Sequence, residues 1–202
     1  METKLQQLID KAEITEVVQR ERAYRDQSRW DDMQRMYHDD AVVDLSWFQG
    51  SGGEFVAASR RLYEAGRHSA HQMGPTLVSL NGKRALAMTG CAVCLRTQLD
   101  GVELELTAHS RLHERLERRD GEWRISWMGI VYLRDLLVPV SPSQHVALDE
   151  ARLARYRSSY RFLSYLLEQT GVAPRDDLPG EDRPETVQPL LLADERWLEE
   201  TR

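Results

Sequence analysis

Three two-residue turn signals divide the middle of the chain at regular spacing. They are Asn81-Gly82, Asp100-Gly101 and Asp120-Gly121. Asparagine or aspartate followed by glycine is the strongest short-range signal for a β-hairpin, because both residues tolerate the positive φ of a tight hairpin turn. The chain between Gln72 and Arg134 is therefore predicted to form four successive antiparallel strands.

The third predicted strand alternates between apolar and polar side chains. From Val102 to Leu112, every second residue is apolar or small, and the residues between them include glutamate, histidine and arginine. The last strand alternates in the same way, with one face formed by Trp123, Ile125 and Trp127. A sheet with such strands covers a core with one face only. The simplest fit is an α+β fold in which a strongly curved sheet wraps around helices, with its other face solvated or against a second subunit.

Helical spacing precedes this sheet. Apolar residues from Leu5 onward predict a helix that ends at Asp26, with a short break near Lys11–Glu13. A second apolar stripe, over residues 30–37, predicts a short helix. Ala41–Asp44 then predicts a strand, which brings the mixed sheet to about five strands.

The loop over Ser46–Gly53 is rich in residues that break regular structure, and Glu54–Ala65 resumes helical spacing up to Gly66. Residues 141–202 are predicted to form a helical extension of a domain made by residues 1–140. Helical spacing indicates a long helix over about 146–169 and a last helix over about 184–200, with an acidic loop between them. The apolar side of the last helix predicts that it docks on its own domain or on a neighbouring subunit.

Charge and composition limit the class of partner. The formal net charge of the 202 residues is −6, whereas binding to nucleic acid or to an anionic membrane needs a positive surface. The N-terminus lacks a run typical of a signal peptide, and no apolar run has the length of a membrane span. We therefore expect a cytoplasmic protein with a small-molecule partner, and neither a nucleic-acid nor a membrane partner.

Two motifs suggest a metal or redox site and are interpreted otherwise. Cys91 and Cys94 form a C-x-x-C motif inside a predicted strand, where residues three apart point to opposite faces. His68 and His71 have no trio of acidic or cysteine ligands at regular spacing, and His109 and His113 lie on the polar face of their strand. No metal and no cofactor are expected.

The best candidates for chemistry are Asp26, at the end of the first helix, and His71, just before the sheet. A histidine with an aligned carboxylate is the usual acid–base pair, because the carboxylate fixes the tautomer and stabilises the protonated ring. Spacing alone also allows a structural role for both residues.

The order of these features resembles the SnoaL-like branch of the nuclear transport factor 2 superfamily. The features are Asp26, the run Asp39-Asp40-Ala41-Val42, His71, Asn81-Gly82 and Arg119-Asp120-Gly121-Glu122-Trp123. The resemblance covers about 5–139 and is strongest to scytalone dehydratase and hexachlorocyclohexane dehydrochlorinase. In these lyases an aspartate at the end of the long helix pairs with a proton-abstracting histidine. The resemblance thus implies a cone-shaped fold and catalytic roles for Asp26 and His71.

The chain also departs from that pattern. Leu45 and Thr89 stand where the dehydratase has a tyrosine and a second histidine, and Glu21 stands where the dehydrochlorinase has a lysine. An anion there serves a halide leaving group poorly, which disfavours haloalkane elimination. The residues expected to line a substrate pocket are Tyr24, Trp47, Thr89, Ser110, Trp127 and Tyr132.

Two functions follow. The first is a cofactor-independent lyase, a dehydratase or an isomerase acting on a small hydrophobic cyclic hydroxy or carbonyl compound. The second is a non-catalytic ligand-binding or assembly subunit, like the small subunits of ring-hydroxylating dioxygenases. The one-sided sheet predicts a homodimer or homotrimer in either case.

Overall fold

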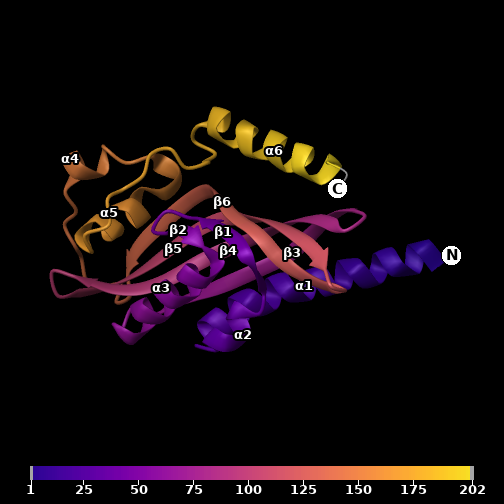
Figure 1. Ribbon diagram of the computed structural model, residues 1–202. Coiled ribbons are helices and arrows are strands. Elements are labelled where there is room, and N and C mark those ends of the chain that lie inside the picture. Colours follow the sequence, from indigo (N-terminus) through magenta and orange to yellow (C-terminus); the bar gives the residue numbers. More distant parts are fainter. Residues whose placement is uncertain (1, 201–202) are drawn as a thin grey trace.

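Six strands form one curved sheet in the computed structural model, which describes residues 2–200 (Figure 1). The sheet order is β2-β1-β6-β5-β4-β3, with β1 parallel to β6 and every other pair antiparallel. The strands are β1 (Tyr37–Asp44), β2 (Gln49–Ser51), β3 (Ser69–Asn81), β4 (Arg84–Leu99), β5 (Val102–Arg119) and β6 (Glu122–Pro139). The predicted α+β fold with a curved mixed sheet is confirmed. The count of about five strands was one short, because β2 lies in the loop interpreted as irregular.

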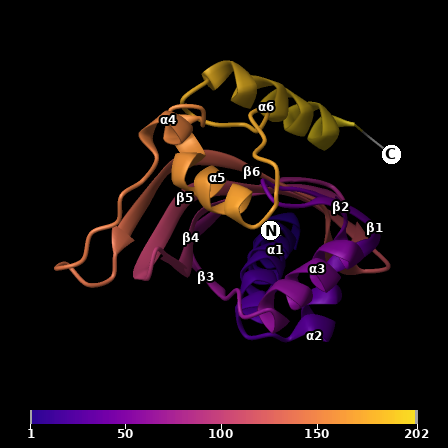
Figure 2. The ribbon, with the colours of Figure 1, turned by 90° about the vertical axis from the view of Figure 1, so that its left-hand side faces the viewer.

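The N-terminal helices pack against the concave face of the sheet. They are α1 (Glu2–Asp26), α2 (Trp30–Gln34) and α3 (Gly52–Glu64), and Figure 2 shows them beneath the arc of strands. Ile14 and Val18 of α1 are fully buried there, and Phe55 of α3 joins the same core. The predicted break in α1 is wrong. Lys11, Ala12 and Glu13 lie within the helix, as good helix formers do.

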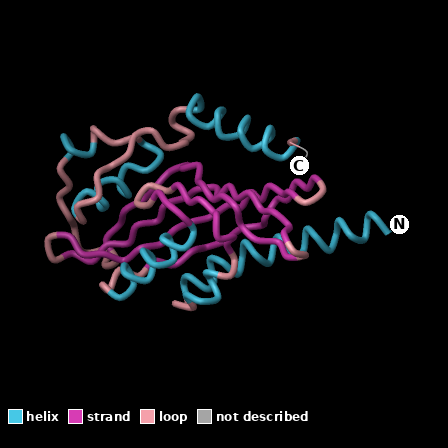
Figure 3. The backbone as a smooth tube through the Cα atoms, in the orientation of Figure 1, coloured by secondary structure: helices cyan, strands magenta, loops and turns pink. Residues whose placement is uncertain are grey.

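The predicted long helix over 146–169 is also wrong. That segment forms α4 (Glu150–Leu153), a 3₁₀ turn over Ser158–Tyr160 and α5 (Arg161–Gln169), which appear as short helices joined by loops in Figure 3. The interruption has a tertiary cause. The buried Arg157 donates to the carbonyl oxygens of Asp176 and Leu178 and to the carboxylate of Asp182, which holds the loop before the last helix.

The last helix, α6 (Pro184–Glu199), docks on the convex face of the sheet. Its Asp194 accepts hydrogen bonds from His113 and Arg115 of β5, and Trp197 lies beneath the guanidinium of Arg84. Part of the polar face of β5 is thus covered by the chain itself. This corrects the expectation that the whole face meets solvent or a second subunit.

Candidate active site

Asp26 and His71 meet where the end of α1 approaches the edge strand β3. The carboxylate oxygen Oδ1 lies 2.6 Å from the ring nitrogen Nδ1 of His71, and Oδ2 accepts the backbone N–H of His71 at 2.7 Å. Two bonds from one carboxylate fix both the backbone and the ring of the histidine. With Nδ1 held by Asp26, the second ring nitrogen, Nε2, is left for a ligand.

Burial and charge keep this histidine neutral. Burial lowers the pKa of His71 to about 4, and the guanidinium groups of Arg22 and Arg25 act in the same direction, against the effect of Asp26. Burial acts to raise the pKa of Asp26, but the hydrogen bonds from His71 outweigh it and the pKa is lowered. At neutral pH the pair is therefore an ionised carboxylate and an unprotonated imidazole, which is the form a general base needs.

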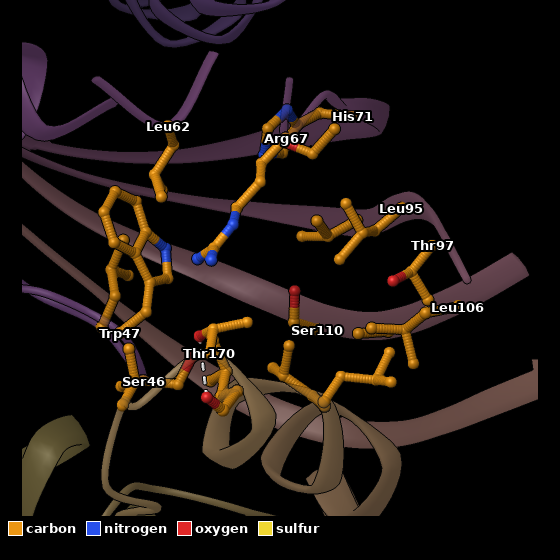
Figure 4. A pocket seen from close by; sticks show the side chains of 18 of the residues that line it. Ser46, Trp47, Leu62, Arg67, His71, Leu95, Thr97, Leu106, Ser110 and Thr170 are labelled. Atoms are coloured by element: carbon orange, nitrogen blue, oxygen red, sulfur yellow. Dashed lines mark hydrogen bonds between the residues drawn. The ribbon is translucent and has the colours of Figure 1, made fainter. Parts of the chain in front are cut away.

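His71 forms part of the wall of a cavity of about 420 Å³. Figure 4 shows this cavity with Trp47 and Leu62 on one side and Leu95 and Leu106 on the other. Asp26 is not part of the wall and lies behind His71. A molecule in the cavity thus meets the histidine first, as expected when the carboxylate orients the base and does not itself react.

The cavity is closed on one side by α5. Leu163, Leu166, Leu167 and Thr170 of this segment line it together with residues of the sheet. Leu166 and Leu106 of β5 are both buried in a second apolar cluster beside the main core. The C-terminal segment therefore supplies part of the ligand-binding surface.

Three of the predicted substrate-binding residues line the cavity. Trp47 packs against Phe55, Ser110 donates to the carbonyl oxygen of Cys91, and the hydroxyl of Tyr132 accepts the backbone N–H of Ser46. The hydroxyl groups of Ser110 and Tyr132 are thus already bonded within the protein. Among the predicted residues that line the cavity, Nε2 of His71 is the atom that can accept a proton, since the indole N–H of Trp47 is a donor only.

The other three, Tyr24, Thr89 and Trp127, lie outside the cavity, and these predictions are corrected. The guanidinium of Arg29 stacks on Tyr24, 4.4 Å from the ring centre. Thr89 is fully buried beneath α1, where its hydroxyl lies 2.9 Å from that of Thr76.

Trp127 points to the convex face because β6 changes register. The pairing of β5 with β6 shifts between Arg115 and Leu116, whose partners are Trp127 and Ile125. An extra residue in one strand reverses which side chains face the core. Met128 is consequently buried in the core, and Trp127 packs beneath the guanidinium of Arg115 instead.

Sequence reasoning missed the arginines of the site. Arg22 and Arg25 stand four residues and one residue before Asp26 on the same helix, and both line the cavity. Glu21 is buried, but it is paired with Arg22 and accepts the hydroxyl of Tyr37 at 2.7 Å. The anion at the dehydrochlorinase lysine position is therefore accompanied by a cation one residue later. The sequence signal that could have found Arg22 is its spacing of four residues from Asp26, which places both side chains on the same face of the helix.

The cysteines are free thiols, with Cys91 buried in the cavity wall, and burial raises its pKa to about 12. Within residues 2–200, no group of three or more histidine, cysteine or acidic side chains is arranged to hold a metal ion. No helix in this part of the chain has the length and apolar character needed to cross a membrane.

The family model of the SnoaL-like domain matches residues 6–128, which is more than half of the chain. The chain belongs to the SnoaL-like domain family, and the predicted resemblance is confirmed. Pea pathogenicity protein 2 of Fusarium vanettenii is 26% identical over 201 residues, which cover 95% of this chain and 86% of that protein. That match includes most of residues 141–202.

Two solved structures share the fold. Hexachlorocyclohexane dehydrochlorinase LinA-type3 from Novosphingobium barchaimii is 16% identical with a TM-score of 0.57. The match covers 72% of this chain and 99% of the dehydrochlorinase chain. A candidate scytalone dehydratase from Novosphingobium aromaticivorans is 14% identical with a TM-score of 0.51. The match covers 70% of this chain and 91% of the dehydratase chain. At such identities the likeness concerns the fold alone.

Proposed function

We propose that this protein is a cofactor-independent lyase of the dehydratase type, or an isomerase, acting on a small hydrophobic cyclic hydroxy or carbonyl compound. The observation that carries the proposal is the 2.6 Å contact between Asp26 and Nδ1 of His71 at the wall of a largely apolar cavity. The structural likeness to a dehydrochlorinase and a candidate scytalone dehydratase is in keeping with it.

In this proposal His71 is the general base and Asp26 the residue that orients it. Nε2 takes the proton from a carbon next to a carbonyl group, and Asp26 stabilises the imidazolium that forms. In a dehydration, the carbon–carbon double bond then forms as the β-hydroxyl group leaves, and His71 returns the proton to give water. In an isomerisation, the same proton returns to a different carbon.

The test uses 3-hydroxy-1-tetralone, a bicyclic β-hydroxy ketone that gives 1-naphthol when it loses water. We expect the protein to accelerate this loss, or to exchange the proton next to the carbonyl group for deuterium in D₂O. His71→Ala should lower either rate about 10²- to 10⁴-fold, because it removes the base. Asp26→Asn should also lower it strongly, with an unchanged circular dichroism spectrum.

His68→Ala is the matched control, since His68 belongs to the same sequence motif but packs on Tyr63. Equal rates in the wild type and in His71→Ala would contradict the proposal.

The second candidate function is a ligand-binding subunit without catalysis. One observation favours it: the dehydratase tyrosine and second histidine are replaced by Leu45, an apolar wall residue, and by Thr89, which lies outside the cavity. Tight binding of the ketone with neither water loss nor deuterium exchange would support this alternative.

A further inference from the structure

The charged residues of the cavity wall all have the same sign. Arg22, Arg25, Arg67 and Arg96 line the cavity, and the described residues of its wall include no aspartate or glutamate. The chain as a whole has a net charge of −6. A concentration of arginine in the wall of one apolar cavity therefore runs against the overall composition and indicates the charge of a ligand.

Three of these arginines already have partners. Arg22 is paired with Glu21, and Arg25 donates to the hydroxyl of Ser69 at 2.7 Å. Arg96 is largely exposed at the rim and donates to Glu105 at 2.7 Å. These interactions hold the three guanidinium groups in place and satisfy part of their hydrogen-bonding capacity.

Arg67 differs from the other three. It lies in the segment between α3 and β3, four residues before His71, and Figure 4 shows its side chain extending into the cavity on the side of Trp47. Arg67 is exposed, and within residues 2–200 its guanidinium group makes no ion pair and no side-chain hydrogen bond. A guanidinium presents paired N–H donors that match the two oxygens of a carboxylate.

We infer that the cavity binds an apolar, ring-bearing carboxylate, and that Arg67 is the residue that binds its carboxylate group. The inference rests on the proposed function in one respect, because it names the substrate class of the same site. The apolar walls formed by Trp47, Leu95 and Leu106 would hold the ring, while His71 faces the same space. Arg22 and Arg25 add positive potential deeper in the wall.

The test compares 1-naphthoate with 1-naphthamide by isothermal titration calorimetry. The two probes have nearly the same shape, and only the first is an anion. The wild type should bind naphthoate at least 10-fold more tightly. Arg67→Gln should weaken naphthoate binding about 10- to 100-fold, the range of a charge-assisted hydrogen-bonded pair, and leave naphthamide binding unchanged.

Arg61→Gln is the matched control, because it removes an exposed arginine of α3 that does not line the cavity. Its binding of both probes should equal that of the wild type. Equal affinity of the wild type for the two probes, no binding of naphthoate at millimolar concentration, or an undiminished preference in Arg67→Gln would each overturn the inference.

His71→Ala separates this inference from the proposed catalysis. That variant should lose turnover of the tetralone and still prefer naphthoate, since the carboxylate contacts Arg67. A wild type that dehydrates the tetralone but shows no preference for naphthoate leaves the lyase proposal standing and removes this inference. A wild type that prefers naphthoate but does not turn over the tetralone supports this inference and removes the lyase proposal.

Discussion

Glu114 is a buried carboxyl group on β5, near the charged groups of Glu21 and Arg22. Neither of its side-chain oxygens has a hydrogen-bond partner among residues 2–200. Burial and the nearby Glu21 raise its pKa to about 8, and Arg22 acts in the opposite direction. Since an isolated buried carboxylate is costly, the folded protein holds Glu114 mostly protonated at neutral pH.

This protonation predicts how stability depends on pH. The unfolded chain loses the Glu114 proton near pH 4.5, its ordinary pKa, while the folded chain keeps it up to about 8. Between these values the folded state binds more protons than the unfolded state. The contribution of Glu114 to the free energy of unfolding therefore falls as pH rises, by up to about 1.4 kcal/mol per pH unit. Urea unfolding of Glu114→Gln between pH 5 and 8 should show this slope removed.

Glu103→Gln is the control for this prediction, because Glu103 is an exposed carboxylate on the same strand. Its profile of unfolding free energy against pH should follow that of the wild type. A profile of Glu114→Gln that runs parallel to the wild type would show that the proton is not held in the folded state.

At the scale of single elements, the start of α3 is set by a capping box. The hydroxyl of Ser51 accepts the backbone N–H of Glu54, and the carboxylate of Glu54 accepts the backbone N–H of Ser51 at 2.9 Å. These bonds satisfy donors that the first turn of a helix leaves open. The helix carries Phe55 and Leu62 into the cavity wall, so the cap also positions part of the site.

Ser51→Ala should lower the free energy of unfolding by about 1 kcal/mol, the usual effect of losing an N-cap side chain. Chemical denaturation measures the change. Ser51→Thr keeps a hydroxyl acceptor at the cap and should recover most of the loss. If alanine and threonine had equal effects, the cap would not be the source of the stability.

The strands were the most predictable elements, because their turns depend on local chemistry. Asp100 and Asp120 have φ of 50° and 52°, and the glycines that follow them also have positive φ, as a tight hairpin requires. The end of α1 at Asp26 was predictable because the apolar helical spacing stops there. The capping box of α3 was equally local, and the pattern Ser51-x-x-Glu54 was available, but the glycines around it were interpreted as a loop.

Long-range contacts explain what the sequence did not predict. The shift in β6 that turns Trp127 outward depends on pairing with β5, and the residues at the shift itself, 115–116 and 125–127, include no glycine or proline. The interruption before α5 depends on Arg157 reaching carbonyl groups about 20 residues later. The contribution of α5 to the cavity follows from that docking, so the helical spacing of residues 146–169 alone could not reveal it.

At the scale of the whole molecule, the two terminal helices differ in how they are covered. The α6 helix occupies part of the convex face, where its Asp194 is buried against β5. The first turns of α1 project beyond the sheet, as Figure 1 shows at the N-terminal end. Leu5, Leu8 and Ile9 of this part are 59%, 66% and 42% exposed. Three apolar side chains on a projecting helix are a surface that another chain can cover.

We therefore propose that the protein forms a homodimer or homotrimer through the N-terminal part of α1. Burial of these apolar side chains against a partner would remove them from water and stabilise the assembly. Light scattering at micromolar concentration should give a multiple of the 23.4 kDa chain mass. The double variant Leu5→Lys, Leu8→Lys should shift the protein to the monomer, because burying two charges at the contact is costly.

Leu77→Lys is the control, since Leu77 is 64% exposed on the edge strand β3, away from this contact. A monomeric wild type would contradict the proposal, and an oligomer that persists in the double variant would place the contact on another surface.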